Sequence, residues 1–506
     1  MSDAAEQSRL YGGWRAPALS GIAGLSLGVT VILLVGGLVT VVLIVTQLWW
    51  IAGAAVAVTV LSAVALTVRL PVAQRTIADL AGLKGRKASA TRSGRAFLAQ
   101  GPVGLTPDGK CRLPGLLAAS EMYSCVDSLG SSFGMLHVPK TQQWSVVIQC
   151  GPPGLPMTDE KDVDQQVAGW AQWLSAIGQD HRDIAGVQVT VESAPDPGVR
   201  LQRAIDASAA PSRPDFVAEA MEQVKQRYPS GQARISTRVV LTFHGRMTGH
   251  TRTAEEMQRR IGNALPGLVA NLTVTGAGQA PRAMSAQEIT DATRVAFDPA
   301  VSALVEQAQN EGGTGLEWTD AGPAQLDDRH PGLLLHDRAV SMSWQMLMPP
   351  RNVVRHDVLA RLLAPHTDVA LKRVTMLFRP MDIEQSARAA DMAERNAAFA
   401  INNTRRVTER EKNKYREARQ AMEEESRGAI LVNFGMIVTA TVINDGEISR
   451  RDVEAARSAV REMSASARIR LRPATYLQAA VFTAGLPLGL VLPDHVSTPA
   501  LVKEAL

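Results

Sequence analysis

Cysteine is scarce in this sequence of 506 residues. Cys111, Cys125 and Cys150 are the three present, and no CxxC pair occurs. An odd, sparse set of this kind excludes a disulfide framework and a cysteine-based zinc site. It is typical of a protein kept in a reducing cytoplasm, where such thiols serve as small buried hydrophobes.

Aromatic residues and net charge are also low. Aromatics make up 4% of the chain, which leaves few platforms on which single-stranded nucleic-acid bases could stack. The formal net charge of +4 is small for this length. The composition therefore gives no support to direct nucleic-acid binding.

A complete nucleotide-binding loop is lacking. Residues 104–111 (GLTPDGKC) match the phosphate-loop pattern except at Cys111, where a magnesium-binding Ser or Thr is required. Pro114 and Gly115 follow at the place where such a loop would open a helix. We therefore interpret this segment as a turn between two strands.

Metal and nucleophile motifs are missing as well. His244 and His250, like His330 and His336, are six residues apart but lack the flanking acids of a metal site. Neither a GxSxG elbow nor a GxGxxG after a strand occurs. We expect no cofactor, no metal and no catalytic residue; an enzyme with an unrecognised site is kept as an alternative.

What the sequence does have is a long uncharged stretch. Residues 16–68 contain no Asp, Glu, Lys, Arg or His. This length suits two apolar helices of ~20 residues each, which we place at 22–45 and 51–70. Trp49 and Trp50 lie between them, as expected for a turn at the membrane interface. A cleaved signal peptide and a buried core hairpin are the alternatives, and the length of the stretch argues against both.

Basic residues set the expected orientation. Arg9 and Arg15 precede the first span, and a basic cluster follows the second. Because basic residues stay on the cytoplasmic side, we expect both termini and the large soluble region to be cytoplasmic, below the inner (plasma) membrane. The members of the cluster expected to meet anionic lipid are Arg69, Arg75, Lys84, Arg86 and Lys87.

The rest of the chain alternates between strand and helix patterns. Expected strands lie at 144–150, 187–191, 234–243, 269–274, 339–348, 369–378, 430–442 and 467–471. Expected helices lie at 162–177, 215–228, 253–265, 284–307, 356–363, 382–426 and 449–463, with breaks at 298–299 and near 402–403. This order predicts an α/β (α+β) fold of repeated β-α-β units in ferredoxin-like layers.

The expected domain organisation follows from these patterns. A cytoplasmic segment (1–20) precedes the transmembrane hairpin (21–70), a basic juxtamembrane and linker region (71–135) and two α/β domains (136–365 and 366–506). The second domain carries a charged helical arm at about 382–427. This arm is either a solvated helix or a partner-binding surface. Its candidate contact residues are Arg405, Arg406, Arg410, Lys412, Lys414 and Arg416.

Several short stretches resemble an actinobacterial family of membrane proteins found in conjugation clusters related to type IV secretion. They are YGGWR (11–15), ESAPDPG (192–198), FDPA (297–300), WTDAGP (318–323), RVTMLFRP (373–380) and IRLR (469–472). In this family the hairpin resembles PrgI-type conjugation proteins, and the last third resembles the non-catalytic N-terminal part of VirB-type secretion ATPases. The resemblance implies that the motor is a separate polypeptide.

Three functions are compatible with this reasoning. The first is a structural, non-catalytic component of a conjugative or type IV secretion-like apparatus, which docks a cytoplasmic ATPase within a multi-protein or oligomeric assembly. The second follows from relatives labelled EccE-like, and is a component of type VII protein secretion. The third is a membrane-anchored enzyme.

Overall fold

The computed structural model shows a mixed α/β protein with 50% helix and 24% strand. It describes residues 27–70, 73–102, 104, 106, 108–152, 159–196, 205, 207, 214–227, 233–247, 249–278, 280–350, 353–402, 407–444, 446 and 448–495.

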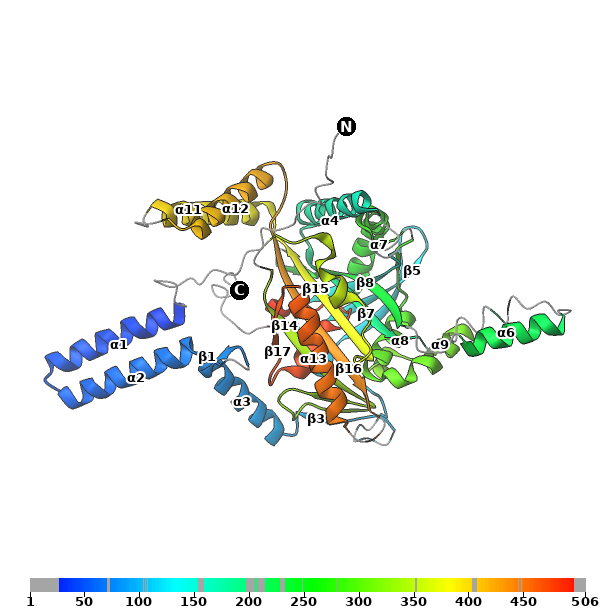
Figure 1. The fold of residues 1–506 in the computed structure, drawn as a ribbon, viewed down its shortest axis with the longest axis horizontal. Helices are drawn as coiled ribbons and strands as arrows, with labels where there is room; N and C mark the ends of the chain where they lie inside the picture. Colours follow the sequence, from blue (N-terminus) through cyan, green and yellow to red (C-terminus); the bar gives the residue numbers. More distant parts are fainter. Residues whose placement is uncertain are drawn as a thin grey trace.

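Two apolar helices form a hairpin that extends from one side of the molecule (Figure 1). They are α1 (Leu27–Val45) and α2 (Trp49–Thr67). Within the described residues, α2 is long and apolar enough to cross a membrane, whereas α1 offers the shorter apolar stretch Val29–Val45. The short strands β1 (Arg69–Leu70) and β2 (Arg75–Thr76) and helix α3 (Ile77–Arg92) lead from the hairpin to the rest of the chain.

Thirteen strands of the described part form one large antiparallel sheet, in the order β3-β12-β13-β14-β16-β15-β7-β8-β6-β5-β4, with β11 beside β6 and β17 beside β14. The strands are β3 (Phe97–Ala99), β4 (Glu121–Val126), β5 (Ser132–Val138), β6 (Gln143–Cys150), β7 (Ile184–Pro195), β8 (Ala233–His244), β11 (Arg282–Ala283), β12 (Gln325–Asp327), β13 (Leu334–His336), β14 (Ala339–Met348), β15 (Leu371–Pro380), β16 (Val432–Ile443) and β17 (Arg470–Pro473). β9 (Arg246–Met247) and β10 (His250–Thr251) pair separately.

Helices lie between many of these strands along the chain. They are α4 (Glu160–Asp180), α6 (Asp215–Arg227), α7 (Ala254–Ala270), α8 (Ala286–Phe297), α9 (Ser302–Asn310), α10 (Ala360–Leu363), α11 (Ile383–Asn402), α12 (Glu409–Ser426), α13 (Arg450–Ser466) and α14 (Gln478–Gly485). Short 3₁₀ turns occur at η2 (Gly115–Leu117), η4 (Asn271–Thr275), η5 (Pro299–Val301), η6 (Trp318–Asp320), η7 (His356–Leu359) and η8 (Leu492–His495).

Two parts of the sheet have the same strand order. Along the sheet, one part runs β11-β6-β8-β7 and the other runs β17-β14-β16-β15. In each part the fourth strand along the chain lies beside the first, and the third lies between the first and second. β7 and β15, the second strands, pair with each other and join the parts. β14, which precedes the expected boundary at residue 365, pairs with β16 beyond it.

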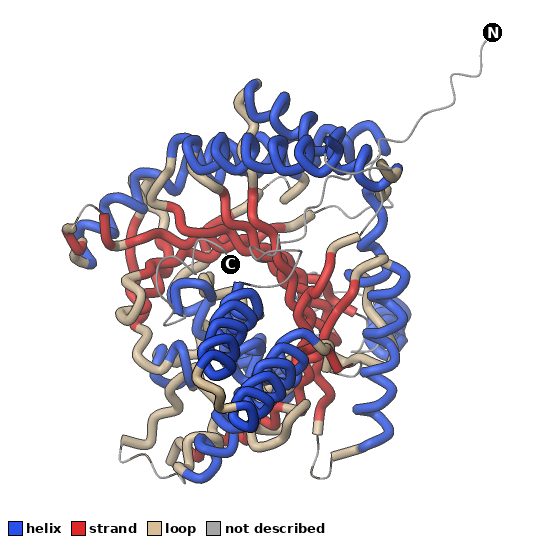
Figure 2. Tube along the Cα trace, turned by 90° about the vertical axis from the view of Figure 1, so that its left-hand side faces the viewer, coloured by secondary structure: helices blue, strands red, loops and turns tan. Residues whose placement is uncertain are grey.

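The segment between the second and third strands of each part carries helices that extend from the sheet. In the first part it contains α6, and in the second it contains α11 and α12. Figure 1 shows α6 extending from one side of the sheet and the α11–α12 pair from the other, the side that also carries α1 and α2. Figure 2 faces this latter side and shows that the sheet is strongly curved.

One face of the sheet is apolar and covered by helices. Trp173 and Ile177 of α4 and Ile261 of α7 pack on alternate residues of β6 and β8. In the other part, α13 packs on β15 and β16, where Val374 and Val438 are fully buried. Burying a large aliphatic side chain stabilises the folded state by about 1.5–3 kcal/mol. These contacts are therefore the main source of stability.

The predicted strand at 269–274 is wrong, because α7 continues to Ala270 and η4 follows it. Pro266 lies inside α7, although proline normally disrupts a helix by leaving one carbonyl without its N–H donor. Here the freed carbonyl of Gly262 accepts a hydrogen bond from the N–H of Ser128 at 3.1 Å. The helix therefore passes through the proline without a lost hydrogen bond.

Candidate interaction surfaces and buried ionic groups

The tryptophans expected in the turn at the membrane interface are the first two residues of α2, directly after the turn at residues 46–48. Trp49 and Trp50 are 65% and 95% exposed, and the outer faces of both helices are apolar and exposed too. Lys84 and Arg86 on α3 are exposed as well. The side chain of Arg69 lies outside the described residues.

Two members of the basic cluster have protein partners instead. Arg75 is half-buried and its guanidinium donates to Gln345 Oε1 at 3.5 Å; burial lowers the pKa of Arg75, an effect that Asp79 opposes. Lys87 is buried and pairs with Asp328. These two side chains hold the α3 region against the sheet. Their contacts are therefore with protein, whereas the sequence predicted contacts with lipid.

The candidate partner residues on the charged arm are partly described. Lys412, Lys414 and Arg416 are exposed on α12, where Lys412 Nζ lies 2.8 Å from Glu409 Oε1. Arg405, Arg406 and the side chain of Arg410 lie outside the described residues. α11 and α12 run side by side as an antiparallel pair (Figure 1).

The segment that resembles a phosphate loop is a turn in its described residues. The N–H of Gly109 donates to the carbonyl of Thr106 at 3.2 Å. Lys110, which would bind phosphate in a true loop, instead pairs with Glu317 at 3.0 Å and Asp320 at 3.2 Å. Its ammonium group therefore joins this turn to the start of η6.

The histidine pairs are not brought together as metal ligands. His336 is buried, with Nδ1 2.5 Å from the carbonyl oxygen of Phe297 and Nε2 2.7 Å from Ser341 Oγ. Burial lowers the pKa of His336 to about 4, so it is neutral at physiological pH. Among the described residues, no group of three or more His, Cys, Asp or Glu side chains could hold a metal ion.

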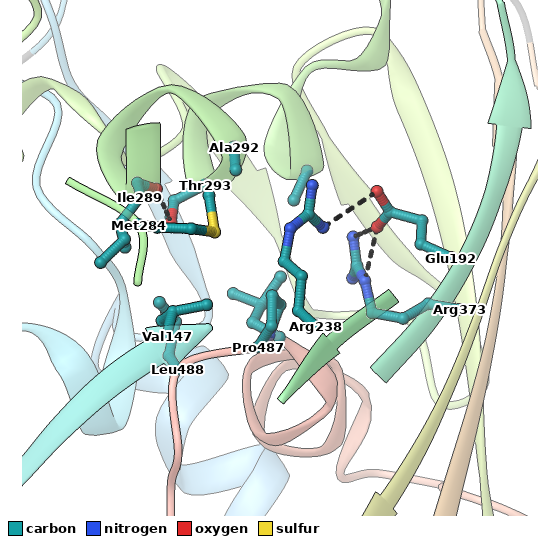
Figure 3. A pocket seen from close by; sticks show the side chains of 12 residues that line it. Val147, Glu192, Arg238, Met284, Ile289, Ala292, Thr293, Arg373, Pro487 and Leu488 are labelled. Atoms are coloured by element: carbon teal, nitrogen blue, oxygen red, sulfur yellow. Dashed lines mark hydrogen bonds and ion pairs between the residues drawn. The ribbon is translucent and has the colours of Figure 1, made fainter. Parts of the chain in front are cut away.

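A buried ionic cluster lies where the two parts of the sheet meet (Figure 3). Arg373 of β15 donates to Glu192 Oε2 of β7 from Nε at 2.8 Å and from Nη2 at 2.6 Å. Arg238 of β8 lies 3.6 Å from Glu192 Oε1. Burial opposes ionisation of Glu192, but the two guanidinium groups outweigh it and hold its pKa below the usual range. A carboxylate fixed in this way is neither a proton donor nor a nucleophile.

A pocket lies beside this cluster, and apart from Thr293 the rest of its lining is apolar (Figure 3). Met284 and Ile289 lie on one side, and Pro487 and Leu488 lie on another (Figure 3). The cluster therefore joins β7, β8 and β15. Sequence reasoning singled out the stretches at 192–198 and 373–380 but could not pair them, because Glu192 and Arg373 are 181 residues apart.

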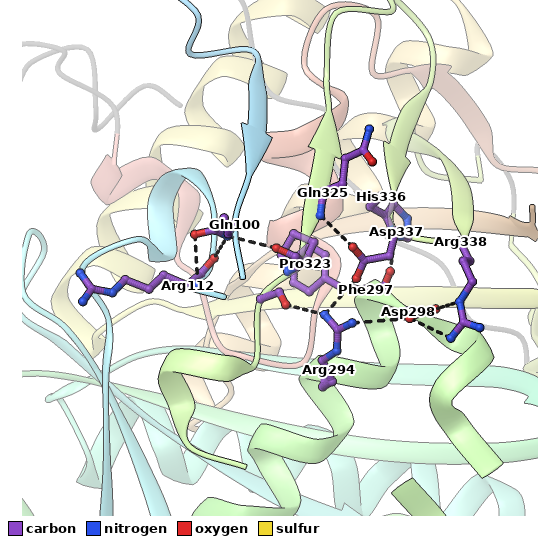
Figure 4. A network of polar contacts seen from close by, with 11 residues as sticks. Gln100, Arg112, Arg294, Phe297, Asp298, Pro323, Gln325, His336, Asp337 and Arg338 are labelled. Carbon is purple, nitrogen blue, oxygen red and sulfur yellow. Dashed lines mark hydrogen bonds and ion pairs between the residues drawn. The ribbon is translucent and has the colours of Figure 1, made fainter. Parts of the chain in front are cut away.

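A second polar network fixes the turn between β13 and β14 (Figure 4). Arg294 of α8 donates to the carbonyl of Gly322 at 2.6 Å and lies 2.9 Å from Asp337 Oδ2. Arg338 and Arg294 both pair with Asp298. The stretches at 297–300 and 318–323 thus have a structural role, since they hold α8 against the turn between β13 and β14.

The second face of the large sheet is buried as well, and polar side chains lie there among apolar ones such as Val147 and Val240. Residues 485–489 lie across it, and side chains of four strands bind their main chain. The hydrogen bonds run from Thr375 Oγ1 to the carbonyl of Gly485 (2.7 Å), Gln188 Nε2 to Leu486 (2.6 Å), Ser145 Oγ to Leu488 (2.8 Å) and Thr242 Oγ1 to Gly489 (2.6 Å). Gly489 has a φ of +75° and contacts Thr242 and Ser145 so closely that a side chain would not fit. Alternation alone would have predicted a solvated face here.

Neither a protein-family model nor a curated protein matches this chain. The fold and the described residues define a mixed α/β protein with an apolar helix of membrane-spanning length.

Proposed function

We propose that this chain is a membrane-anchored, non-catalytic scaffold that docks a separate cytoplasmic protein. The observation that supports it best is the arrangement of its extensions. Apolar helices lie at one side of a continuous sheet, and the amphipathic helix α6 extends from the opposite side (Figure 1). Through its resemblance to conjugation-cluster proteins, we assign the scaffold to a conjugative or type IV secretion-like apparatus and its partner to the ATPase of that apparatus.

The apolar residues of α6 form the proposed docking surface. Phe216 is 80% exposed, and Val217 and Val224 are exposed as well. Apolar side chains grouped on an exposed amphipathic helix mark a surface that another protein covers, often in a hydrophobic groove. The ATPase family recovered with the protein would distinguish conjugation from type VII secretion.

Substitution of Phe216 and Val224 by serine is expected to remove this partner. An aromatic anchor at the centre of an interface contributes about 2 kcal/mol or more, so recovery should fall more than about tenfold. The measurement is affinity purification from native membranes in mild detergent, followed by mass spectrometry. Leu129→Ser, at an exposed residue of the β4–β5 turn, is the matched control. Undiminished recovery with the α6 variant would exclude α6 as the docking surface.

We also propose that both α1 and α2 cross the membrane, with the sheet in the cytoplasm. The apolar outer faces of both helices and the basic residues after α2 support this orientation. Cysteine at Gln47, in the turn, should react with a membrane-impermeant maleimide in intact cells. Cysteine at Lys84 should react only after the cells are permeabilised. The reverse pattern would contradict the orientation.

We further infer that the two parts of the sheet are repeats of one ferredoxin-like unit. The shared strand order supports this, as does the position of the helical insertions after β7 and after β15. Because β7 and β15 are antiparallel neighbours, equivalent insertions leave the sheet in opposite directions. A duplication of this kind would explain why one insertion faces the membrane side and the other faces away from it.

A further inference from the structure

The charges of the α11–α12 arm are unevenly distributed along its length. The arm joins the sheet where the N–H of Met381 donates to the carbonyl of Leu431 at 3.0 Å. The first half of α12 therefore lies at the free end of the arm and the second half lies near the sheet. Residues 409–416 include four basic and two acidic residues. Residues 417–426 include one basic and four acidic residues. The free half carries +2 and the near half carries −3.

This distribution opposes the preference of the helix itself. The macrodipole favours acidic residues near the N-terminus of a helix and basic residues near its C-terminus. The first turn of α12 obeys this rule: Thr408 and Glu411 form a capping box, and Glu409 lies beside them. The last turn has three acidic residues and no basic one, and Arg427 at the C-cap is the one basic residue that follows the rule at that end of the helix. Helix stability does not explain the pattern, and local rules are broken most often where a function requires it.

Two exposed apolar residues of α11 lie between its middle and the same free end. Phe399 and Met392 are 70% and 62% exposed, and their spacing of seven residues puts them on one face of the helix. The two helices meet through small residues such as Ala390 and Ala418, which are buried. Because the helices are antiparallel, the last turn of α11, with Phe399, lies beside the first turn of α12.

The free end thus combines an exposed aromatic ring with lysine and arginine side chains, on the side of the sheet that carries α1 and α2 (Figures 1 and 2). We propose that this end, formed by Phe399, Lys412, Lys414 and Arg416, binds the anionic headgroup surface of the bilayer that α1 and α2 enter. The proposal rests on the membrane anchoring proposed above and adds a second point of contact.

Several features favour a lipid surface as the occupant. Basic side chains near an anionic leaflet are attracted to it, and an aromatic ring is stable at the level of the headgroups. The anchored hairpin keeps the arm at high effective concentration near the bilayer, so a weak contact is sufficient. The acidic half near the sheet is repelled by the same headgroups, which confines the contact to the free end.

The test places a nitroxide spin label at Phe399→Cys in the full-length protein, on a Cys111→Ser background, in lipid nanodiscs. Cys125 and Cys150 are buried and are not expected to react. In nanodiscs with 30% anionic phosphatidylglycerol, the label should be accessible to oxygen and protected from a water-soluble nickel complex. In pure phosphatidylcholine the protection should be lost. The triple variant Lys412→Glu, Lys414→Glu, Arg416→Glu should weaken the contact by more than about tenfold in the anionic nanodiscs.

A charge-matched control separates this effect from net charge. Arg388→Glu, Arg419→Glu and Arg427→Glu change the charge by the same amount in the half near the sheet, and the label should stay protected. A second label at Val58→Cys in α2 reports membrane anchoring in the same samples. Lipid exposure at 58 with a water-exposed label at 399 would overturn this proposal and leave the anchoring intact. Water exposure at both positions would overturn both. Protection at 399 that requires the co-purified partner and not anionic lipid would assign the arm to that partner.

Discussion

Replacement of Arg373 by alanine is expected to destabilise the protein by about 3–5 kcal/mol, because it leaves a buried carboxylate without its main partner. Arg373 is 1% exposed and donates two hydrogen bonds to Glu192. Arg238, at 3.6 Å, compensates only part of the lost charge. The shift of the urea unfolding midpoint of the detergent-solubilised protein measures the effect.

Two further variants give this prediction its controls. Arg379→Ala, at a half-buried residue of the same strand, should cost far less. The double variant Glu192→Gln, Arg373→Met removes both charges and should recover most of the lost stability, since a buried pair replaced by apolar or neutral groups is often neutral overall. A loss below about 1 kcal/mol for Arg373→Ala would mean that the pair contributes no more than an exposed ion pair does.

Acidification from pH 7 to pH 5 is expected to cost about 2 kcal/mol through His336 alone. Its pKa is about 4 in the folded protein and 6.5 in the unfolded chain. Between these two pH values, His336 is therefore protonated in the unfolded chain and neutral in the folded protein. The stability is fully present above pH 6.5 and is lost progressively as the pH falls toward 4. Burial is the main cause, and the nearby Arg373 acts in the same direction.

The difference between the wild type and His336→Gln isolates this contribution. Glutamine removes the titration, so the stability of the variant should depend less steeply on pH between 6.5 and 5, even if it is lower at pH 7. His330→Gln, at an exposed residue, serves as the control and should retain the steep dependence of the wild type. Parallel pH profiles for wild type and His336→Gln would contradict the prediction.

Much of the secondary structure could be predicted because its signals are local. The helix expected from residue 253 begins there, because Thr253 caps α7 and forms a capping box with Glu256. The break at Asp298-Pro299 falls between α8 and η5, and β14 has the predicted bounds. At 269–274 the predicted strand is replaced by the end of α7 and η4, and the carbonyl that Pro266 leaves free is satisfied by a distant N–H, that of Ser128.

The order of the strands could not be predicted from these local signals. The sequence shows β6, α4 and β7 in succession, but β8 lies between β6 and β7 in the sheet. The charged residues were equally difficult to interpret. Lys87 and Arg75 look like lipid-facing cations in the sequence, whereas their partners Asp328 and Gln345 lie more than 200 residues away. Long-range partners of this kind leave no local pattern.

The seam between β7 and β15 has a mechanical consequence. The two strands are antiparallel and pair from Lys372–Ser193 to Phe378–Val187. The chain leaves β7 at Pro195 toward α6 and leaves β15 at Pro380 toward the arm. A force that pulls these two extensions apart would load the seam in shear, so that its hydrogen bonds share the load instead of breaking one at a time. In the proposed scaffold, tension between a partner bound to α6 and the membrane would therefore act on the sheet along the direction of its strands.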